Sequence, residues 1–390
     1  MSAVLQKFPF PELNMLDFSK VDSVKLRQRH LMRKMSRRIF FRKSIIKEPQ
    51  GGGQKARFFK NPHVPWSTMW LSNSSSSSSH MFILTGIPGL DAAHIWLSVP
   101  FTCIYTASLV GNCMILFVIR SDSSLHEPMY QLLSMLAMTD LGLSLSTAPT
   151  VMRVFWANCR EISFDACFAQ VYFVHSFSFM ESSVLLAMAF DRYVAICYPL
   201  RYTSILTSAR TAKIGLAALC RCLFGVLPSL FLLRRLPFCR SHVLSHAYCL
   251  HQDLIKLVCA DITFNSMYGL AVAILIVVLD PLLILLSYIR ICKTIVRFPS
   301  RRERLKALNS CLSHVLAVLI LYIPMVGLSM VHRFGKNASP LIHVFLANIY
   351  LLVPPVLNPI IYSIKNKQIR RGVLKVLTPR KSFFPWHRST

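Results

Sequence analysis

The chain has 390 residues, of which 54% are hydrophobic and 15% charged, and its 44 Lys and Arg against 16 Asp and Glu give a formal charge of +28. A soluble domain carries about 25% charged residues, and a disordered or nucleic-acid-binding basic protein does not reach a mean hydropathy of +0.48. The composition excludes these classes and favours an integral membrane protein.

Residues 1–80 differ from the rest of the chain. Residues 1–72 lack an apolar run and carry 15 Lys and Arg against 4 acids. This pattern predicts a basic, disordered N-terminal extension, and a patch for nucleic acid or anionic lipid is the functional alternative. Asn73-Ser74-Ser75 is an acceptor sequence for N-glycosylation, so we expect Asn73 to be glycosylated and to lie outside the cell.

Seven apolar stretches follow this extension. The hydrocarbon core of a bilayer is about 30 Å thick, which a helix of about 20 residues crosses, and backbone polar groups within it must be paired inside the protein. The sequence therefore predicts an all-α membrane protein, a seven-transmembrane-helix bundle with a short amphipathic helix after the seventh span. The predicted spans are about 96–119, 129–152, 164–197, 211–233, 264–290, 307–331 and 341–363.

The distribution of Lys and Arg predicts the orientation, because these residues accumulate in cytoplasmic loops. If the chain enters the membrane from outside, the cytoplasmic segments hold 20 Lys and Arg and the outer segments between spans hold 8. We therefore expect the N-terminus outside and the C-terminus in the cytoplasm. The folded domain is expected over 81–378, and a cytoplasmic tail over 379–390.

The third span ends in Asp191-Arg192-Tyr193, and other motifs stand at matching places along the chain. They are Gly111-Asn112, Leu125-His126-Glu127-Pro128-Met129-Tyr130, Ser287-Tyr288, Ser313-His314 and Pro355-Val356-Leu357-Asn358-Pro359-Ile360-Ile361-Tyr362. With these motifs the chain resembles the odorant (olfactory) receptors among the rhodopsin-like G-protein-coupled receptors. The strings Ile87-Pro88-Gly89-Leu90 and His332-Arg333-Phe334-Gly335 resemble its class I, fish-like subgroup.

This resemblance implies a multi-pass receptor of the plasma membrane. Its partners would be a small-molecule odorant, membrane lipid and a stimulatory or olfactory heterotrimeric G protein that raises cAMP. Class I members tend to recognise polar odorants such as carboxylic acids. No nucleic-acid partner is expected.

Arg192 is expected to act as a switch at the inner end of the third span. Its neighbour Asp191 can hold the guanidinium in the resting bundle and release it when the sixth span moves outward. The resemblance assigns Tyr193 to the same switch. It also implies that Asn358, Pro359 and Tyr362 in the seventh span take part in coupling to the G protein.

Asp140 and Glu181 are carboxylates within the second and third spans. Each costs about 2.5–3.5 kcal/mol at mid-membrane, so each needs a partner. The two can share a proton or hold a sodium ion, with Asn112 and Asn358 as polar neighbours. No other cofactor or metal is expected.

Five cysteines lie on the predicted outer side, four in outer segments and Cys167 at the outer start of the third span; the four are Cys159, Cys239, Cys249 and Cys259. Five cannot all pair, and any four allow three connectivities. The resemblance implies a disulfide between Cys167 and Cys249. It leaves Cys239 and Cys259 for a second bridge and Cys159 as the odd thiol.

A ligand is expected between the outer halves of the spans, under the second outer loop. The predicted ligand-binding residues are His175, Ser178, Ser182, Gln252, Ser329 and Arg333. Among them Arg333 is the predicted anchor for an acid, because a guanidinium grips a carboxylate bidentately. Apolar side chains are expected to select ligand length, and they are Phe179, Met267, Leu270 and Ile274.

Two other functions remain as alternatives. One is a receptor of the same fold for a non-odorant metabolite outside the nose. The other is an ion-coupled transporter that uses Asp140, Glu181 and Asp280 as a relay, but the two halves of the chain show no internal repeat. An enzyme is not expected, because the chain lacks the HExxH, G-x-S-x-G and Walker sequences.

Overall fold

The computed structural model describes residues 81–87, 89, 94–239, 242–335 and 339–378. The predicted N-terminal extension, the glycosylation sequence at Asn73 and the tail over 379–390 lie outside these residues.

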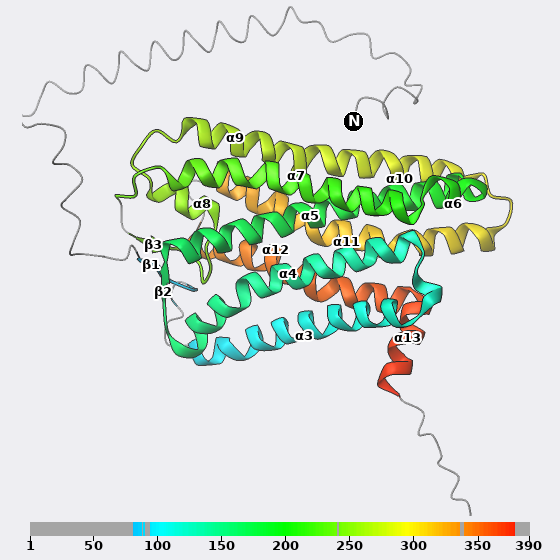
Figure 1. Cartoon of the computed structure of the whole chain (residues 1–390), viewed down its shortest axis with the longest axis horizontal. Coiled ribbons are helices and arrows are strands. Elements are labelled where there is room, and N and C mark those ends of the chain that lie inside the picture. The colour runs from blue at the N-terminus through cyan, green and yellow to red at the C-terminus, as the bar shows by residue number, and fades with distance from the viewer. Residues whose placement is uncertain (1–80, 88, 90–93, 240–241, 336–338, 379–390) are drawn as a thin grey trace, which may run out of the picture. The chain divides into compact units, whose positions relative to one another are not determined.

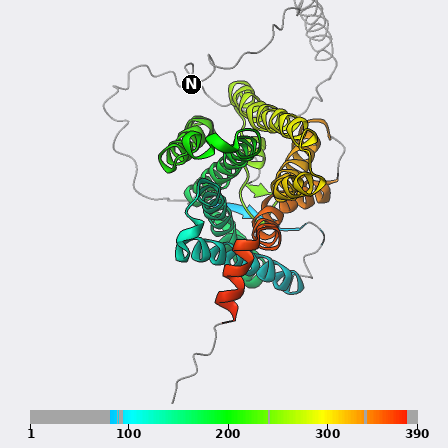
Figure 2. The ribbon, with the colours of Figure 1, turned by 90° about the vertical axis from the view of Figure 1, so that its right-hand side faces the viewer.

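Seven long helical segments of the described chain lie side by side in one bundle, seen along its length in Figure 1 and end-on in Figure 2. The segments are α3 (His94–Ser121), α4 (Pro128–Ala157), α5 (Phe164–Cys197), α7 (Ser208–Arg234), α9 to α10, α11 (Arg301–Phe334) and α12 (Pro340–Lys365). The fifth segment runs from α9 (Thr263–Ile274) through the π-helix η6 (Leu275–Leu279) into α10 (Asp280–Val296). The predicted seven-helix bundle is confirmed.

Within the described chain, six of these segments are long and apolar enough to cross a membrane by composition alone, and α4 is the more polar seventh. The hydroxyl groups of α4 are paired. Ser134 and Thr139 donate to carbonyls one turn earlier, while Ser144 and Thr147 bond to Ser108 and Tyr105 of α3. Because these hydroxyls are satisfied inside the bundle, α4 can span the bilayer despite its polarity.

The predicted amphipathic helix after the seventh span is α13 (Lys367–Leu377). The Asn366 side chain caps it by accepting hydrogen bonds from the backbone N–H groups of Gln368 and Ile369. Ile369 is fully buried, and Gly372 lies so close to Val118 of α3 that a Cβ atom there would be 2.3 Å from its methyl group. The packing of α13 on α3 therefore requires a glycine at this position.

Short elements connect the long helices. They are η3 (Ser123–Leu125), η4 (Pro199–Arg201), α6 (Tyr202–Ile205), α8 (His251–Leu254) and η5 (Ile255–Leu257). A three-stranded sheet, which the sequence analysis did not predict, lies at one end of the bundle (Figure 1). Its strands β1 (Met81–Leu84), β2 (Glu161–Ser163) and β3 (Val243–Leu244) are too short for a recognisable alternating pattern.

In this sheet β1 is central, antiparallel to β2 and parallel to β3, with Phe82 opposite Ile162 and Ile83 opposite Val243. Two disulfides lie in the same outer region, Cys167–Cys249 and Cys239–Cys259, with Cα atoms 5.5 Å and 6.0 Å apart. Disulfides belong to oxidising compartments. Their place at the end opposite to Arg192 agrees with an outer N-terminus.

An ion pair between partly buried Arg221 and buried Asp280 joins α7 to α10 at mid-depth. Arg221 Nη2 lies 2.8 Å from Asp280 Oδ2, and Arg221 Nη1 also donates to Ser183 Oγ of α5. Asp280 Oδ2 accepts from Ser182 of α5, whose hydroxyl also contacts Tyr322 of α11. Four helices therefore share one polar network, in which the charges of Arg221 and Asp280 neutralise each other.

The π-helix η6 stands directly before this network. Pro281 lacks an N–H group, and the backbone N–H of Asp280 bonds to Leu275 O, five residues back. Such a wide turn offsets the residues that follow it around the helix axis. Asp280, which follows η6, faces α5 and α7 and is buried.

Replacing one member of the pair should be costly. We expect Arg221→Met to lower the free energy of unfolding by about 3–5 kcal/mol, because Asp280 then stays buried without a cation. The double variant Arg221→Met with Asp280→Leu should recover most of this loss. Thermal unfolding of the purified protein in detergent measures both.

Lys213→Met is the matched control, since Lys213 is an exposed cation on the same helix. Its effect should stay within about 0.5 kcal/mol. If Arg221→Met and the control unfold at the same temperature, the buried pair does not stabilise the bundle.

Candidate functional site

A cavity of about 740 Å³ lies in the outer half of the bundle. Its walls come from α5, α7, α9, α11 and α12, and residues of α8 in the second outer loop also line it. Five of the six predicted ligand-binding residues line this cavity. They are His175, Ser178, Gln252, Ser329 and Arg333.

The sixth, Ser182, does not line the cavity. Its hydroxyl is fully buried, 2.5 Å from Asp280 Oδ2 and 2.9 Å from Tyr322 OH, one turn below Ser178. Ser182 follows Ser178 by four residues and lies on the same face of α5, but at its depth the hydroxyl is bound to Asp280. Ser182 therefore belongs to the structural network and not to the cavity wall.

Two of the four apolar residues predicted for the cavity wall do not line the cavity. Phe179 and Leu270 line the cavity, whereas Met267 and Ile274 have 61% and 50% of their surface exposed on the outside of α9. In a membrane span such exposed apolar side chains face lipid, and hydropathy alone does not distinguish lipid-facing from cavity-facing positions.

The cavity contains polar groups that sequence reasoning missed. Ser229 Oγ of α7 contacts His251 Nε2 at 3.0 Å and Asn265 Oδ1 of α9 at 3.1 Å. Asn265 Nδ2 and His175 Nε2 are buried without a hydrogen-bond partner within the described residues. The rings of His175 and His251 are 6.2 Å apart, edge to face. These groups give the cavity a second polar region besides that of Arg333.

The second outer loop is fixed over the cavity by more than its disulfides. Gln170 of α5 accepts a hydrogen bond from the Cys249 backbone N–H at 2.8 Å. His246 Nδ1 lies 2.5 Å from Asp253 Oδ2, and Lys256 Nζ lies 3.2 Å from Asp253 Oδ1. The short helix α8, which carries His251 and Gln252 into the cavity, is thus held by an ionic cluster.

Two loop side chains have shifted pKa values. Burial lowers the pKa of His251 to about 4, against a smaller opposite effect of its hydrogen bond to Asn265. This imidazole is therefore neutral at pH 7. Burial alone would raise the pKa of Asp253, but the hydrogen bond and charge of His246, with the charge of Lys256, hold it below its usual value.

The cytoplasmic end of α5 has the expected pairing. Arg192 Nη2 lies 2.9 Å from Asp191 Oδ2, and Arg192 Nη1 donates to Ser310 Oγ of α11 at 3.0 Å. Tyr202 OH donates to Asp191 Oδ1 at 2.7 Å. Arg192 is thus tied both to its neighbour and to α11. Nothing local in the sequence identified Ser310 as the partner of Arg192.

The remaining switch residues lie around this end. Tyr193 OH contacts Tyr198 OH at 3.5 Å, and its ring packs against the inner ends of α10 and α11. Tyr362 is buried with its hydroxyl 3.9 Å from Met188 Sδ of α5. Pro359 lies against Gly111 of α3, where a Cβ atom would be 3.0 Å from the proline ring.

Asp140 and Glu181 come together across α4 and α5. Asn358 Nδ2 of α12 lies 3.1 Å from Asp140 Oδ2 and 3.4 Å from Glu181 Oε1. Glu181 Oε2 and Asn358 Oδ1 are buried without a hydrogen-bond partner within the described residues. Asn112 is not part of this cluster, because its amide donates to Ser108 O and Pro355 O.

Comparisons with known proteins agree with this arrangement. The family described as "Olfactory receptor" matches residues 101–380. Olfactory receptor 51Q1 of Homo sapiens is 64% identical over 297 residues, 76% of this chain and 94% of the relative. Olfactory receptor 51G2 of Homo sapiens is 58% identical over 303 residues, 78% of this chain and 96% of the relative.

The fold also matches a solved structure. Squid rhodopsin superposes with a TM-score of 0.60 at 14% identity, covering 75% of this chain and 87% of that protein. At this identity the likeness shows the fold alone. The relatives are receptors, which agrees with the expectation that the chain is not an enzyme. The extent of the family match, the curated relatives and the seven-helix fold together show that this chain belongs to the olfactory receptor family.

Proposed function

We propose that the outer cavity of this odorant receptor binds a small carboxylic acid. The observation that carries the proposal is Arg333 at the outer end of α11. Among the described residues that line the cavity, it alone bears a permanent charge. A guanidinium binds a carboxylate through two parallel hydrogen bonds. The apolar wall, which includes Phe179 and Leu270, suits the hydrocarbon part of such a ligand.

Two hydroxyl groups that line the cavity offer further polar contacts to a ligand. Ser329 lies one turn from Arg333 on α11, and its hydroxyl donates to Met325 O at 2.8 Å. Ser178 likewise donates to Val174 O at 2.9 Å. Each hydroxyl oxygen keeps a lone pair that can accept a hydrogen bond from a ligand hydroxyl. The cavity therefore suits an acid that also carries a hydrogen-bond donor.

The proposed signal passes along α11. Its outer end lines the cavity at Ser329 and Arg333, Tyr322 contacts Ser182 at mid-depth, and Ser310 holds Arg192 at the inner end. A ligand that displaces the outer half of α11 would weaken the bond between Ser310 and Arg192. The opened inner face would then engage a stimulatory or olfactory G protein and raise cAMP.

Asp140 and Glu181 are proposed to hold either a sodium ion or one shared proton. Glu181 Oε2 and Asn358 Oδ1 are oxygen atoms of the type that a hard cation prefers, and both lack a hydrogen-bond partner in the described chain. A shared proton would instead remove the repulsion between two buried carboxylates.

The acid anchor is tested by Arg333→Ala. Loss of a charge-assisted bidentate contact should cost about 1.5–3 kcal/mol, which raises the EC50 for an acid agonist about tenfold to 150-fold. A cAMP reporter assay at matched surface expression measures the shift, with small acids, alcohols and aldehydes as the ligand set.

Arg235→Ala is the control, since Arg235 is an outer cation stacked on Phe231, 4.0 Å from the ring centre, and is not among the cavity residues. Arg333→Lys should give an intermediate EC50. A full response of Arg333→Ala to acids would exclude Arg333 as the anchor.

The inner tether is tested by Ser310→Ala. Removing the acceptor of Arg192 should destabilise the resting state and raise agonist-independent cAMP about tenfold, the equivalent of about 1.4 kcal/mol. Ser287→Ala is the matched control, because among the described residues the Ser287 hydroxyl bonds only to Leu283 O within its own helix. Equal basal signalling in the two variants would contradict a role of Ser310 in the switch.

The occupant of the carboxylate pair is tested by thermal unfolding in NaCl and in KCl at equal ionic strength. A bound sodium ion stabilises the folded receptor by mass action, so the midpoint should be higher in NaCl. The difference should vanish in Glu181→Gln. Equal midpoints in the two salts would exclude sodium and leave the shared proton.

A further inference from the structure

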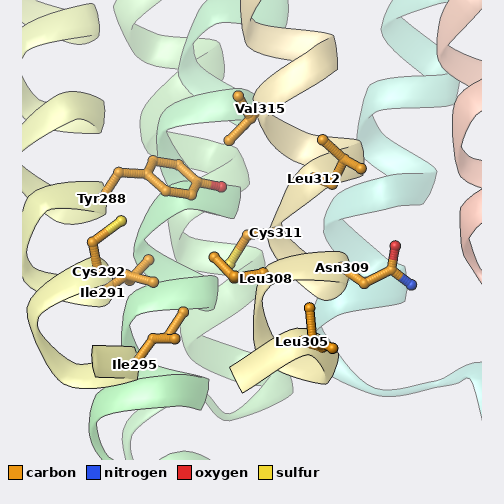
Figure 3. Close-up of a pocket in the computed structure, with 10 residues that line it drawn as sticks. All are labelled: Tyr288, Ile291, Cys292, Ile295, Leu305, Leu308, Asn309, Cys311, Leu312 and Val315. Atoms are coloured by element: carbon orange, nitrogen blue, oxygen red, sulfur yellow. The ribbon is translucent and has the colours of Figure 1, made fainter. Parts of the chain in front are cut away.

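A second hollow, of about 400 Å³, lies between the inner halves of α10 and α11 (Figure 3). We call it the inner groove. Its lining is mostly apolar and includes Ile291, Cys292, Ile295, Leu305, Leu308 and Leu312. Its phenol, Tyr288, already bonds to His314 Nδ1 at 2.8 Å. The ligand of this groove must therefore be apolar over most of its length.

The inner groove opens to the outside of the bundle. Leu305, Leu308 and Leu312 are 56%, 47% and 39% exposed along its α11 edge. Ile291 and Ile295 are buried in its floor and pack with residues of α5. The neighbouring residue Ser310 points elsewhere, to Arg192. The groove is thus open on the outer surface of the bundle and not into the crevice at Arg192.

Arg301 lies at the cytoplasmic end of the face of α11 that carries Leu308 and Leu312. At about 100° per residue, Arg301 lies within about 20° of Leu308 and Leu312 around the helix axis. Arg301 and its neighbour Arg302 are exposed. Neither forms an ion pair or a side-chain hydrogen bond with the described residues. Lys306 lies about 140° from Arg301, on another side of α11.

We propose that the inner groove binds an anionic phospholipid of the cytoplasmic leaflet. One acyl chain lies along Leu305, Leu308 and Leu312, and the phosphate group lies at Arg301 and Arg302. The positive charge of Arg301 and Arg302 selects an anionic headgroup, because anionic lipids of this leaflet attract Lys and Arg near the surface. A guanidinium also matches the geometry of phosphate oxygens.

The general accumulation of cations on the cytoplasmic side does not account for this placement. That accumulation sets the orientation of the chain but does not select a face of a helix. Arg301 continues the same stripe that forms the groove wall, and its guanidinium has no partner in the described chain. The two features together fit one amphipathic ligand with a chain and an anionic head.

The experiment uses the full-length receptor in nanodiscs with phosphatidylserine or phosphatidylcholine of identical acyl chains. Photoreactive forms of both lipids, with a diazirine in the acyl chain, are crosslinked and the modified peptides identified by mass spectrometry. Phosphatidylserine should label the segments 288–295 and 305–315 more strongly than phosphatidylcholine does. Native mass spectrometry gives the relative affinities.

Three variants locate the site. Arg301→Gln with Arg302→Gln should weaken phosphatidylserine binding by about fivefold per residue and leave phosphatidylcholine unchanged. Leu308→Trp should fill the groove and remove the crosslinks of both lipids. Lys306→Gln, which removes one cation from another side of the same helix, is the control for a single charge and should retain the preference for phosphatidylserine.

Several results would overturn the proposal. These are equal labelling by the two lipids, labelling confined to other helices, or a loss in Lys306→Gln as large as in the arginine variant. A loss of G-protein activation in the arginine variant with lipid labelling unchanged would also do so, and would assign this surface to the G protein. The arginine variant alters only exposed side chains, so its result stands even if Leu308→Trp fails to fold.

Discussion

The ion pair between Arg221 and Asp280 is the interaction on which the rest of the bundle depends. A bilayer offers no water to solvate a charge, so each buried charge must find a partner inside the protein. This pair does so across α7 and α10, and Ser182 and Ser183 of α5 share its hydrogen bonds. Through Ser182 the network reaches Tyr322 of α11. The relative rotation of four helices is therefore set at mid-depth, below the outer cavity and above the inner switch.

Through Tyr322 this network also holds α11, the helix that connects the outer cavity with the inner switch. Its outer turns line the cavity at Ser329 and Arg333, and its inner turns meet Arg192 at Ser310 and the groove at Leu308. Between them, His314 contacts Leu185 O of α5 and Tyr288 of α10. Pro324 interrupts the hydrogen-bond ladder of α11 between the cavity and these contacts. The helix can therefore respond at its inner end to what binds at its outer end.

The two membrane faces use different physical means to hold their sites. On the outer side, two disulfides and the cluster of His246, Asp253 and Lys256 fix a polar loop, so that its polar groups reach the cavity from a rigid support. On the inner side, a few separate hydrogen bonds join α5 and α10 to α11, with no disulfide among the described residues there. Covalent and ionic contacts suit a recognition site that must keep its shape. Single hydrogen bonds suit a switch whose two states differ by a few kcal/mol.

The sequence by itself determined the seven spans, their orientation, the amphipathic α13 and the pairing of Arg192 with its neighbour Asp191, because hydropathy, charge bias and adjacency are local properties of the chain. The resemblance of its motifs further indicated the family and both disulfide pairings. The place of polar side chains along the chain and their chemistry indicated five of the cavity residues. Only the tertiary structure decided the partners of Arg221 and Asp280, the removal of Ser182 from the cavity, the tether at Ser310 and the inner groove. Each of these depends on how one helix is rotated against another. That rotation follows from packing among all seven helices and, at Asp280, from a π turn that no periodic pattern in the sequence reveals.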